Sequence, residues 1–317
     1  MANMTPSRPG QANLTGDVKA LYLKMFAGEV LTAYETKRVA SMYTRNRQIT
    51  AGKSAQFPVL GKASGGYHVP GTEINGRGIA SNEVVITIDD LLESDVSIAN
   101  YDEAMSHYDV RSEYSKQMGI FLANTEDKQL LQLGILAARS AARITGEQGG
   151  SVITSATAGT DAEALITAAF AAAQKFDEKD VPEDERAFFV RPAQYYLLAQ
   201  STKLLNKDWG GQGVYAEGKV LRVAGMEIVK TNNLPQATVT NGTTDAGTDN
   251  KYAGLFNTTV ALALQKGALG SVTLMDLAMD AEYEARYQAT LLVAKFAKGY
   301  GVLAPQAAIE IRSGTPV

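Results

Sequence analysis

The sequence predicts an α+β fold, because helix and strand patterns occur both in long separate runs and in one mixed segment. Residues 102–144 carry apolar side chains at helical spacing and contain no proline. Residues 274–284 and 291–300 alternate between apolar and polar side chains, which predicts two long strands. Residues 186–230 read as a strand, a helix and two further strands. These observations predict one domain built on a long helix and long strands, and a second domain of mixed order.

Length and composition are those of a folded protein of about two domains. The chain has 317 residues, of which 45% are hydrophobic and 20% charged, and domains average ~150 residues. It contains no cysteine and only two histidines, His68 and His107. Disulfides, thiol nucleophiles and cysteine or multi-histidine metal centres are therefore excluded. The net charge of −4 also argues against a protein that grips nucleic-acid phosphates.

The first residues of the chain read as an arm followed by a helix. Residues 1–17 are polar, with two prolines, and lack the apolar core of a signal peptide. From Val18 the apolar side chains recur at helical spacing to Leu31. The most apolar stretch, 162–173, is far shorter than the ~20 residues that span a bilayer. We expect a soluble intracellular chain without a membrane partner.

Two strands around a long glycine-rich loop predict a projecting finger. Residues 54–60 and 83–89 read as strands, and the 22 residues between them, 61–82, include six glycines and Pro70. Hairpin loops usually have 2–5 residues, and loops beyond ~12–15 are uncommon unless they are functional or disordered. Such a finger buries little against its own domain, so we expect it to lie on a neighbouring subunit. The alternative is a mobile surface loop.

The remaining elements follow from local signals. The long run 102–144 carries a stripe that includes Tyr114, Met118 and Leu122, which predicts a strongly amphipathic helix with one possible break near Asn124. Asp161 is the expected N-cap of a helix to Phe176, and Pro192 starts another to Gln200. Strands are expected at 186–190, 220–223, 226–230 and 307–312, and loops at 146–160, 209–218 and 236–251.

No catalytic or cofactor motif is present. Gly52-Lys53-Ser54 resembles the end of a phosphate loop, but Arg47 stands where the first glycine is required and a strand follows where a helix is needed. His68 and His107 are expected in contact or capping roles. Asp89, Asp90, Glu93 and Asp95 are four carboxylates in seven residues, a set that binds a hard cation when the backbone folds around it. We expect them instead to mark a strand-to-helix turn, and predict no cofactor and no metal.

Two blocks of opposite charge predict pairing between surfaces. The segment 83–109 holds eight acidic and no basic residues, whereas 36–53 holds five basic and no acidic residues. Complementary blocks of this kind set register between partners more than they add affinity. The hypothesis is that some of this pairing occurs between subunits. Pairing within one chain, or two solvated faces, is the alternative.

The chain resembles the major capsid proteins of tailed bacteriophages, and among them those of the T-seven-like short-tailed phages. The strings that carry this resemblance run in order along the chain: YLKMFAGEVLTAYE (22–35), GKSAQFPVLG (52–61), VITIDDLLESDV (85–96), HYDVRSEYSKQMG (107–119), VPEDERAFFVRP (181–192), VAGMEIV (223–229) and AKFAKGYGVLAPQAA (294–308). The resemblance implies the Hong Kong 97-type capsid fold. It assigns an N-terminal arm to 1–52, an extended loop to 53–88, a peripheral domain with a spine helix to 89–150 and 270–317, and an axial domain to 151–269.

The resemblance also implies a function and partners. A subunit of this kind joins copies of itself into pentamers and hexamers of an icosahedral head that encloses double-stranded DNA. A scaffolding protein, a portal protein at one vertex and weak non-specific contact with DNA would be its further partners, with assembly in the host cytoplasm. The expected inter-subunit contacts are Lys37, Arg38, Arg45, Arg47, Lys62, Tyr67, His68, Arg77, Asp89, Asp90, Glu93 and Asp95. Two alternatives stay open, an encapsulin-like compartment shell and a soluble α/β enzyme.

Overall fold

A computed structural model describes residues 30, 32–34, 37–101, 110–201, 222–240 and 251–315. The expected arm 1–17, the helix from Val18, His107 and the loop 209–218 lie outside the described residues. The helices are α3 (Val110–Ala138), α4 (Ala162–Glu178) and α5 (Pro192–Gln200), with short 3-10 turns η1 (Ala40–Tyr43) and η4 (Pro305–Ala307). The strands are β1 (Arg45–Gln48), β2 (Ser54–Leu60), β3 (Ser81–Thr87), β4 (Leu92–Ala99), β5 (Ser151–Thr154), β6 (Arg186–Val190), β7 (Arg222–Val223), β8 (Met226–Lys230), β9 (Thr259–Gln265), β10 (Leu269–Glu284), β11 (Ala289–Val302) and β12 (Ala308–Arg312).

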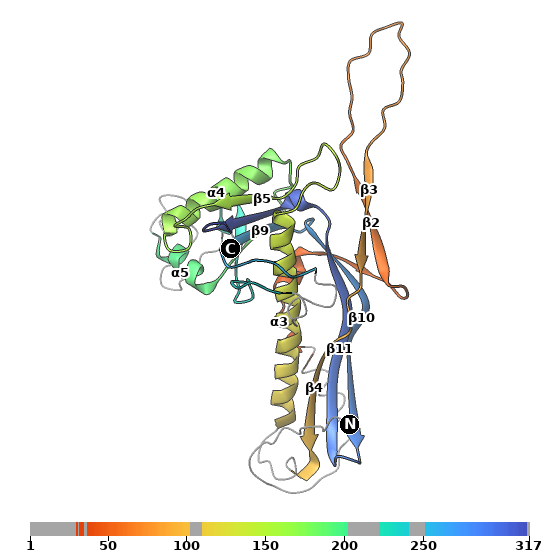
Figure 1. Ribbon diagram of the computed structural model, residues 1–317, viewed down its shortest axis with the longest axis vertical. Helices are drawn as coiled ribbons and strands as arrows, with labels where there is room; N and C mark the ends of the chain where they lie inside the picture. Colours follow the sequence, from red (N-terminus) through yellow and green to blue (C-terminus); the bar gives the residue numbers. More distant parts are fainter. Residues whose placement is uncertain are drawn as a thin grey trace.

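A four-stranded sheet runs beside the long helix α3 and forms the elongated part of the molecule (Figure 1). Its strand order is β1-β10-β11-β4, and β10 and β11 pair antiparallel along most of their length. The alternation seen in the sequence directs Leu292, Ala294 and Phe296 of β11 into a core shared with Met118 and Leu122 of α3. The two long strands are therefore confirmed, and their polar residues alternate onto the opposite face.

The helix α3 is continuous, so the expected break near Asn124 is wrong. Only the first half of the helix is amphipathic. From Leu122 to Ala138 every side chain is buried or half-buried, on all faces of the helix. The reason is that the helix leaves the core against the four-stranded sheet after Ala123 and enters a second, larger core, which packs around Leu130 to Ala138. The helix ends at Ala138, before the expected residue 144, because the chain crosses its end at Gly150, whose amide donates to the Ser140 carbonyl at 2.9 Å.

A six-stranded sheet in the order β5-β12-β9-β6-β8-β7 forms the second part of the molecule, with α4 and α5 beside it (Figure 1). Strand β6 is buried at all five positions, which explains its unbroken apolar sequence. The expected cap is confirmed, since the Asp161 carboxylate accepts from the Glu163 amide at 3.2 Å. Pro192 occupies the first turn of α5, as expected.

The strands of each sheet come from more than one of the segments that the resemblance assigns to separate parts of the subunit. Strand β12, in the segment expected to be peripheral, pairs with β5 and β9 of the six-stranded sheet. Strand β1, in the segment expected to be the arm, runs parallel to β10 in the four-stranded sheet. The domain boundaries stay a prediction. In the described part of the chain, each of the two sheets nevertheless combines strands from segments that lie far apart in the sequence.

Candidate assembly interfaces

Strands β2 and β3 form the root of the expected finger. They pair antiparallel from Ser54 opposite Thr87 to Leu60 opposite Ser81. Ala55, Val84 and Ile86 pack with residues of β10 and of the end of β11 in a small separate core. Gly299 of β11 permits this approach, because a Cβ atom there would lie 2.2 Å from the Thr87 carbonyl oxygen. The root of the finger is therefore part of the folded body.

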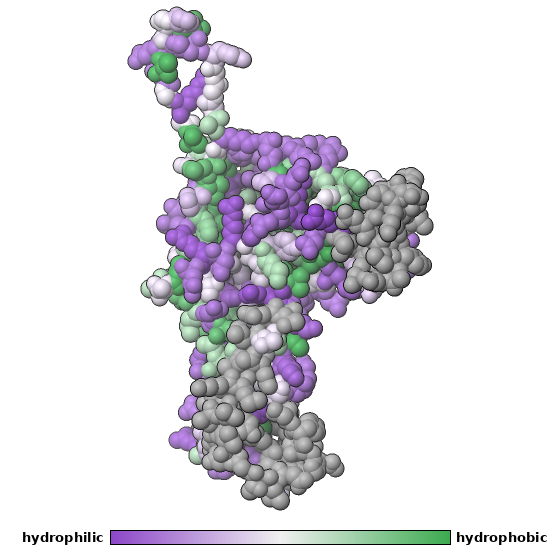
Figure 2. All heavy atoms as spheres, turned by 180° about the vertical axis from the view of Figure 1, so that it is seen from behind, coloured by the Kyte–Doolittle hydropathy of each residue, from purple (hydrophilic) through white to green (hydrophobic). Residues whose placement is uncertain are grey.

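Beyond the root the finger projects away from the body (Figure 1). Every residue from Lys62 to Ala80 is exposed. The exposed side chains include large apolar ones, with Tyr67 fully exposed and Ile74 exposed at 77%. Figure 2 shows apolar and polar side chains intermingled over this tip. Exposed apolar side chains that are held away from their own core are typical of a surface that contacts another molecule.

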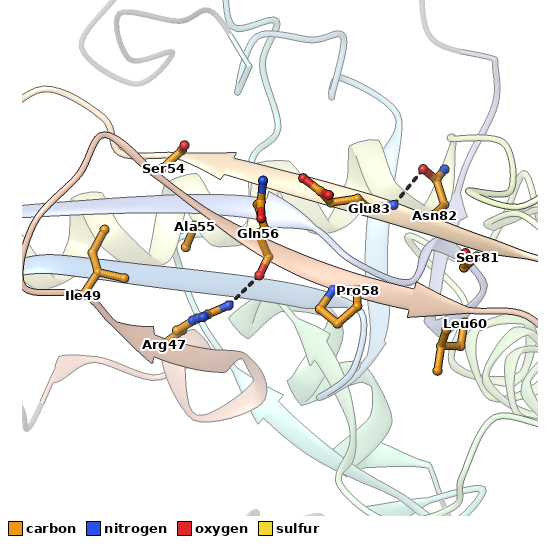
Figure 3. A pocket seen from close by; sticks show the side chains of 10 residues that line it. All are labelled: Arg47, Ile49, Ser54, Ala55, Gln56, Pro58, Leu60, Ser81, Asn82 and Glu83. Carbon is orange, nitrogen blue, oxygen red and sulfur yellow. Dashed lines mark hydrogen bonds between the residues drawn. The ribbon is translucent and has the colours of Figure 1, made fainter.

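Polar contacts fix the root of the finger against the body. The Arg47 guanidinium donates to the Gln56 carbonyl at 2.5 Å and lies 5.8 Å from the Phe57 ring centre. On the other strand, the Asn82 amide donates to the Arg143 carbonyl at 2.6 Å. Figure 3 shows Arg47 reaching toward Gln56 beside a hollow that is lined by residues of β2 and the start of β3. Contacts within one chain therefore fix the direction in which the finger projects.

The expected contact residues of the finger divide into two groups. Tyr67, His68 and Arg77 lie in the exposed tip. Lys62 instead lies at the root, where its ammonium pairs with the Asp180 carboxylate at 2.5 Å and its amide donates to Glu147. Hydrogen bonding to Asp180 raises the pKa of Lys62. Lys62, like Arg47, thus makes contacts inside its own chain.

The acidic block does not form the expected strand-to-helix turn. Glu93 and Asp95 lie in strand β4, which pairs with β11, and both are exposed. Asp89, half-buried between β3 and β4, forms an ion pair with Lys251 and accepts from the Tyr252 hydroxyl. Asp90 is exposed. Among the described residues no group of three or more acids and histidines converges as a metal site would require.

Glu93 and Asp95 belong to a larger acidic face, which we define as Glu93, Asp95, Asp280 and Glu282 on the outer side of the four-stranded sheet. Asp95 and Asp280 both lie opposite Val293, so they point to the same side of the sheet. Lys295 lies on this side too and pairs with Asp280 at 2.6 Å. Sequence reasoning missed Asp280 and Glu282. Their spacing of two residues within an alternating strand was the signal.

The basic block 36–53 is likewise spread over the body. Lys37 and Arg45 are exposed. Arg38 is half-buried, and its guanidinium lies 5.1 Å from the centre of the Tyr34 ring. Arg45 and Arg47 stand on β1, at the edge of the four-stranded sheet opposite to β4. Arg45 and Arg47 of one charge block, and Glu93 and Asp95 of the other, therefore occupy opposite edges of one sheet.

A buried polar cluster behind this sheet was not anticipated. The Tyr34 hydroxyl donates to the Glu126 carboxylate, and Lys298 donates to Tyr34 at 2.6 Å and to Glu126 at 3.4 Å. Burial raises the pKa of Tyr34 and lowers that of Lys298, although Glu126 opposes the shift of Lys298. No sequence pattern marks these residues, because they come from three distant segments.

Comparison with known proteins identifies the family. Residues 56–312 match the family model described as Gp10A-like major capsid protein. The major capsid protein of Escherichia phage T7 is 34% identical over 97% of this chain and 98% of its own length. The chain belongs to the Gp10A-like family of major capsid proteins. It is a structural subunit of a phage capsid, located in the virion, where copies of the chain assemble into the shell.

Solved structures agree with this membership. The capsid structure of the cyanophage P-SCSP1u matches with a TM-score of 0.79 and 44% identity over 98% of this chain and 99% of that one. The mature capsid of bacteriophage PhiM1 matches in fold, with a TM-score of 0.72 and 20% identity over 87% of this chain and 86% of that one. The expected Hong Kong 97-type capsid fold is therefore confirmed. Family membership also sets aside the alternative of a soluble enzyme. No helix in the described part of the chain has the length and apolar character needed to cross a membrane.

Proposed function

We propose that this subunit forms pentameric and hexameric rings that join into an icosahedral head around double-stranded DNA, and that its finger covers a neighbouring subunit in each ring. The observation that carries the proposal is the finger, whose root is fixed while its tip, 63–80, is exposed throughout. A contact between different patches of identical subunits closes into rings when the rotation permits it. A thin tip on a rigid root suits rings of both five and six members.

Charge indicates where neighbouring subunits meet. The exposed tip carries one cation, Arg77, together with His68 and the single acid Glu73. The acidic face on the outer side of the four-stranded sheet has the sign opposite to that of Arg77. We therefore propose that the inter-subunit contacts use Tyr67, His68 and Arg77 on one side and Glu93 and Asp95 on the other. Lys37, Arg38, Arg45, Asp89 and Asp90 are further proposed contacts. Arg47 and Lys62 contribute by holding the finger in place.

The assignment of the segments of the chain to parts of the subunit belongs to the same proposal. We assign the arm to 1–52, the extended loop to 53–88, the peripheral domain to 89–150 and 270–317, and the axial domain to 151–269. Assembly in the host cytoplasm on a scaffolding protein, with a portal protein at one vertex, accounts for a closed container that is later filled. The net charge of −4 fits weak, non-specific contact with DNA, because a strongly basic lining would hold the duplex in place.

Electron microscopy of a tip variant tests the proposal. The double variant Tyr67→Ser, Ile74→Ser removes two exposed apolar side chains that touch no core, so its thermal unfolding should match that of the original chain. Negative-stain images, recorded with and without a scaffolding protein, should show closed shells for the original chain and unassembled subunits for the variant. Phe170→Ser on α4 is the matched control, since Phe170 is also exposed, at 57%, but lies outside the finger.

The outcomes separate the possibilities. Shells from the Phe170 control but not from the tip variant support the finger as an assembly contact. Normal shells from the tip variant would show that these side chains of the finger are not an assembly contact. Small monomers or dimers of the original chain under every condition would contradict assembly by this chain itself.

A further inference from the structure

The exposed tip of the finger contains an asparagine that is followed by a glycine, Asn75-Gly76. In such a pair the side chain of the asparagine can react with the backbone nitrogen of the next residue. The reaction requires that this nitrogen be accessible and that the chain bend toward the side chain. Glycine meets the second requirement best, because it has no Cβ atom. A second pair, Asn241-Gly242, lies outside the described residues.

The surroundings of Asn75 and Gly76 meet both requirements. Both residues are exposed, in a stretch without regular secondary structure on the projecting finger (Figure 1). The Gly76 amide makes no hydrogen bond to a described residue. A Cβ atom on Gly76 would meet no atom within 4 Å, so no neighbouring group in the described chain hinders the bend. Two groups that the chain itself holds side by side react at a high effective concentration.

Asn82, at the start of β3 in the same hairpin, shows the opposite arrangement. Its side-chain amide donates to the Arg143 carbonyl at 2.6 Å, and its side-chain oxygen accepts from the Glu83 amide at 2.8 Å. The nitrogen that would have to attack is therefore already bonded, and it belongs to a strand that pairs with β2. Asn82 is exposed, as Asn75 is. It is thus an internal reference in which exposure is the same and the geometry differs.

We propose that Asn75 is a self-modification site, which the unassembled chain converts to aspartate and isoaspartate. After the Gly76 amide loses its proton, its nitrogen attacks the side-chain carbonyl carbon of Asn75. The new C–N bond closes a succinimide ring, the bond to the side-chain nitrogen breaks, and that nitrogen takes up a proton and leaves as ammonia. Water then adds to either ring carbonyl and opens the ring. One opening gives aspartate, and the other gives isoaspartate, in which the main chain passes through the side-chain carbon.

The product changes the charge of the tip. Glu73 and Arg77 are the charged residues of the tip, and their charges cancel. A carboxylate at position 75 gives the tip a net negative charge. Like charges that meet at a contact oppose it, and in the proposed function the tip faces the acidic face of a neighbouring subunit. The consequence, which rests on that proposed function, is that subunits left unassembled lose the ability to join a shell, whereas a covered tip keeps Asn75 unmodified.

Peptide mass spectrometry of the full-length, unassembled chain during storage tests the site. Trypsin releases residues 63–77 as one peptide, and replacement of the side-chain NH2 by OH raises its mass by ~1 Da. The modified fraction should grow with time, and faster at higher pH, because the attacking nitrogen must lose a proton. Asn82, read from the fragment ions of its own peptide, should stay unmodified over the same period. Electron-transfer fragmentation distinguishes isoaspartate from aspartate.

Three variants separate the reaction from its surroundings. Gly76→Ala adds a side chain beside the attacking nitrogen and should slow the conversion at least ~10-fold, since intramolecular attack depends steeply on geometry. Asn75→Gln should show no conversion over the same period, because a larger ring closes more slowly. Ser64→Ala, elsewhere in the exposed tip, is the matched control and should convert as the original chain does. All three should unfold at the temperature of the original chain, because none of these positions is buried.

The effect on assembly is measured separately. Asn75→Asp carries the charge of the product from the start and should give fewer shells than Asn75→Gln in negative-stain images. In shells of the original chain, conversion should be at least ~10-fold slower than in the unassembled chain, because a covered tip cannot bend into the reactive geometry.

Each result decides one part of the question. A mass gain at Asn75 that grows with time, is slowed by Gly76→Ala and is absent at Asn82 supports the site. No gain at Asn75, or an equal gain at Asn82 or in Asn75→Gln, overturns it. Equal conversion in shells and in the unassembled chain, or equal numbers of shells from Asn75→Asp and Asn75→Gln, overturns the effect on assembly and leaves the site standing. A chain that forms no shells at all contradicts the proposed function, whereas the conversion is measured without shells.

Discussion

A single side chain joins the end of helix α3 to the six-stranded sheet of this subunit. The Arg139 guanidinium, at the end of α3, donates to both carboxylate oxygens of Glu310 at 2.6 Å. Glu310 lies in β12 and is fully buried, and it also accepts from the Thr259 hydroxyl at 2.7 Å. Arg139 donates further to the Leu255 carbonyl at 2.6 Å. A guanidinium that donates to both oxygens of a carboxylate fixes the relative orientation of the two groups and also pairs their charges.

Removing Arg139 should therefore destabilise the chain strongly. In Arg139→Ala the Glu310 carboxylate stays buried without its cation, which typically costs ~3–5 kcal/mol. Denaturant unfolding of the unassembled chain measures the change. Lys266→Ala is the control, because the Lys266–Glu185 pair is exposed at both partners and such pairs contribute ~0–1 kcal/mol. Equal losses in the two variants would contradict the assigned role of Arg139.

At the scale of whole elements, Gly119 shows how a helix is adapted to what packs on it. Glycine in a helix is normally unfavourable relative to alanine by ~1 kcal/mol, and the sequence marks Gly119 as a weak point of α3. The structure gives the reason, since the backbone of Val30 and Tyr34 lies where a side chain would be. A Cβ atom on Gly119 would also be 2.9 Å from the Ala33 Cβ.

The sign of the effect of Gly119→Ala is therefore diagnostic. With the backbone of Val30 and Tyr34 packed on α3, the added methyl should lower the free energy of unfolding by ~1–3 kcal/mol, because overpacking outweighs the helix preference. If that backbone did not pack on α3, the same change should stabilise the chain. Thermal unfolding distinguishes the two. Gly76→Ala in the finger is the control and should be nearly neutral, because no atom lies within 4 Å of the added Cβ.

The finger is an element whose two parts serve different purposes. Its root contributes to a core and its tip does not. Replacing residues 63–79 by Asn-Gly should leave the melting temperature of the unassembled chain within ~2 °C of the original, since no buried area is lost. Calorimetry checks this. A large drop in melting temperature would show that the tip stabilises its own subunit, contrary to the exposure of every residue in it.

At the scale of the whole molecule, the acidic face and Arg77 in the tip of the finger carry opposite charges at separate places on one subunit. Such an arrangement favours head-to-tail contacts between copies over contacts within one copy. The acidic face and the tip of the finger are the two proposed surfaces. Because both are exposed, their attraction should be sensitive to salt over the ~8 Å screening length at physiological ionic strength.

Reversing the acidic face should therefore block shell formation without unfolding the chain. We expect Glu93→Lys, Asp95→Lys to remain folded by circular dichroism and to give no shells in sedimentation or microscopy. Adding Arg77→Glu to this variant should restore part of the assembly if the two surfaces meet. Assembly of the reversed variant at the level of the original chain would rule out the acidic face as a contact.

The sequence predicted local structure well wherever a local signal existed. The cap at Asp161, the proline start of α5 and the alternation of β10 and β11 are all determined by neighbouring residues, and all are confirmed. The turn expected at 89–95 was wrong, because a run of acids is compatible with a strand whose outer face is solvated. The amphipathic pattern expected over 102–144 was wrong in its second half, because the larger core packs around the helix there.

The sequence by itself determined the α+β class, the long helix, the paired long strands, the finger and the capsid family, since each depends on residues close in the chain or on ordered strings along it. Only the tertiary structure decided that β12 joins the six-stranded sheet and that Arg47 and Lys62 hold the finger. It also decided that the Tyr34 hydroxyl donates to Glu126 and the Ala40 amide to Asp127. These contacts join residues that lie far apart in the chain. Their energy comes from burial and pairing in three dimensions, which no local periodicity records.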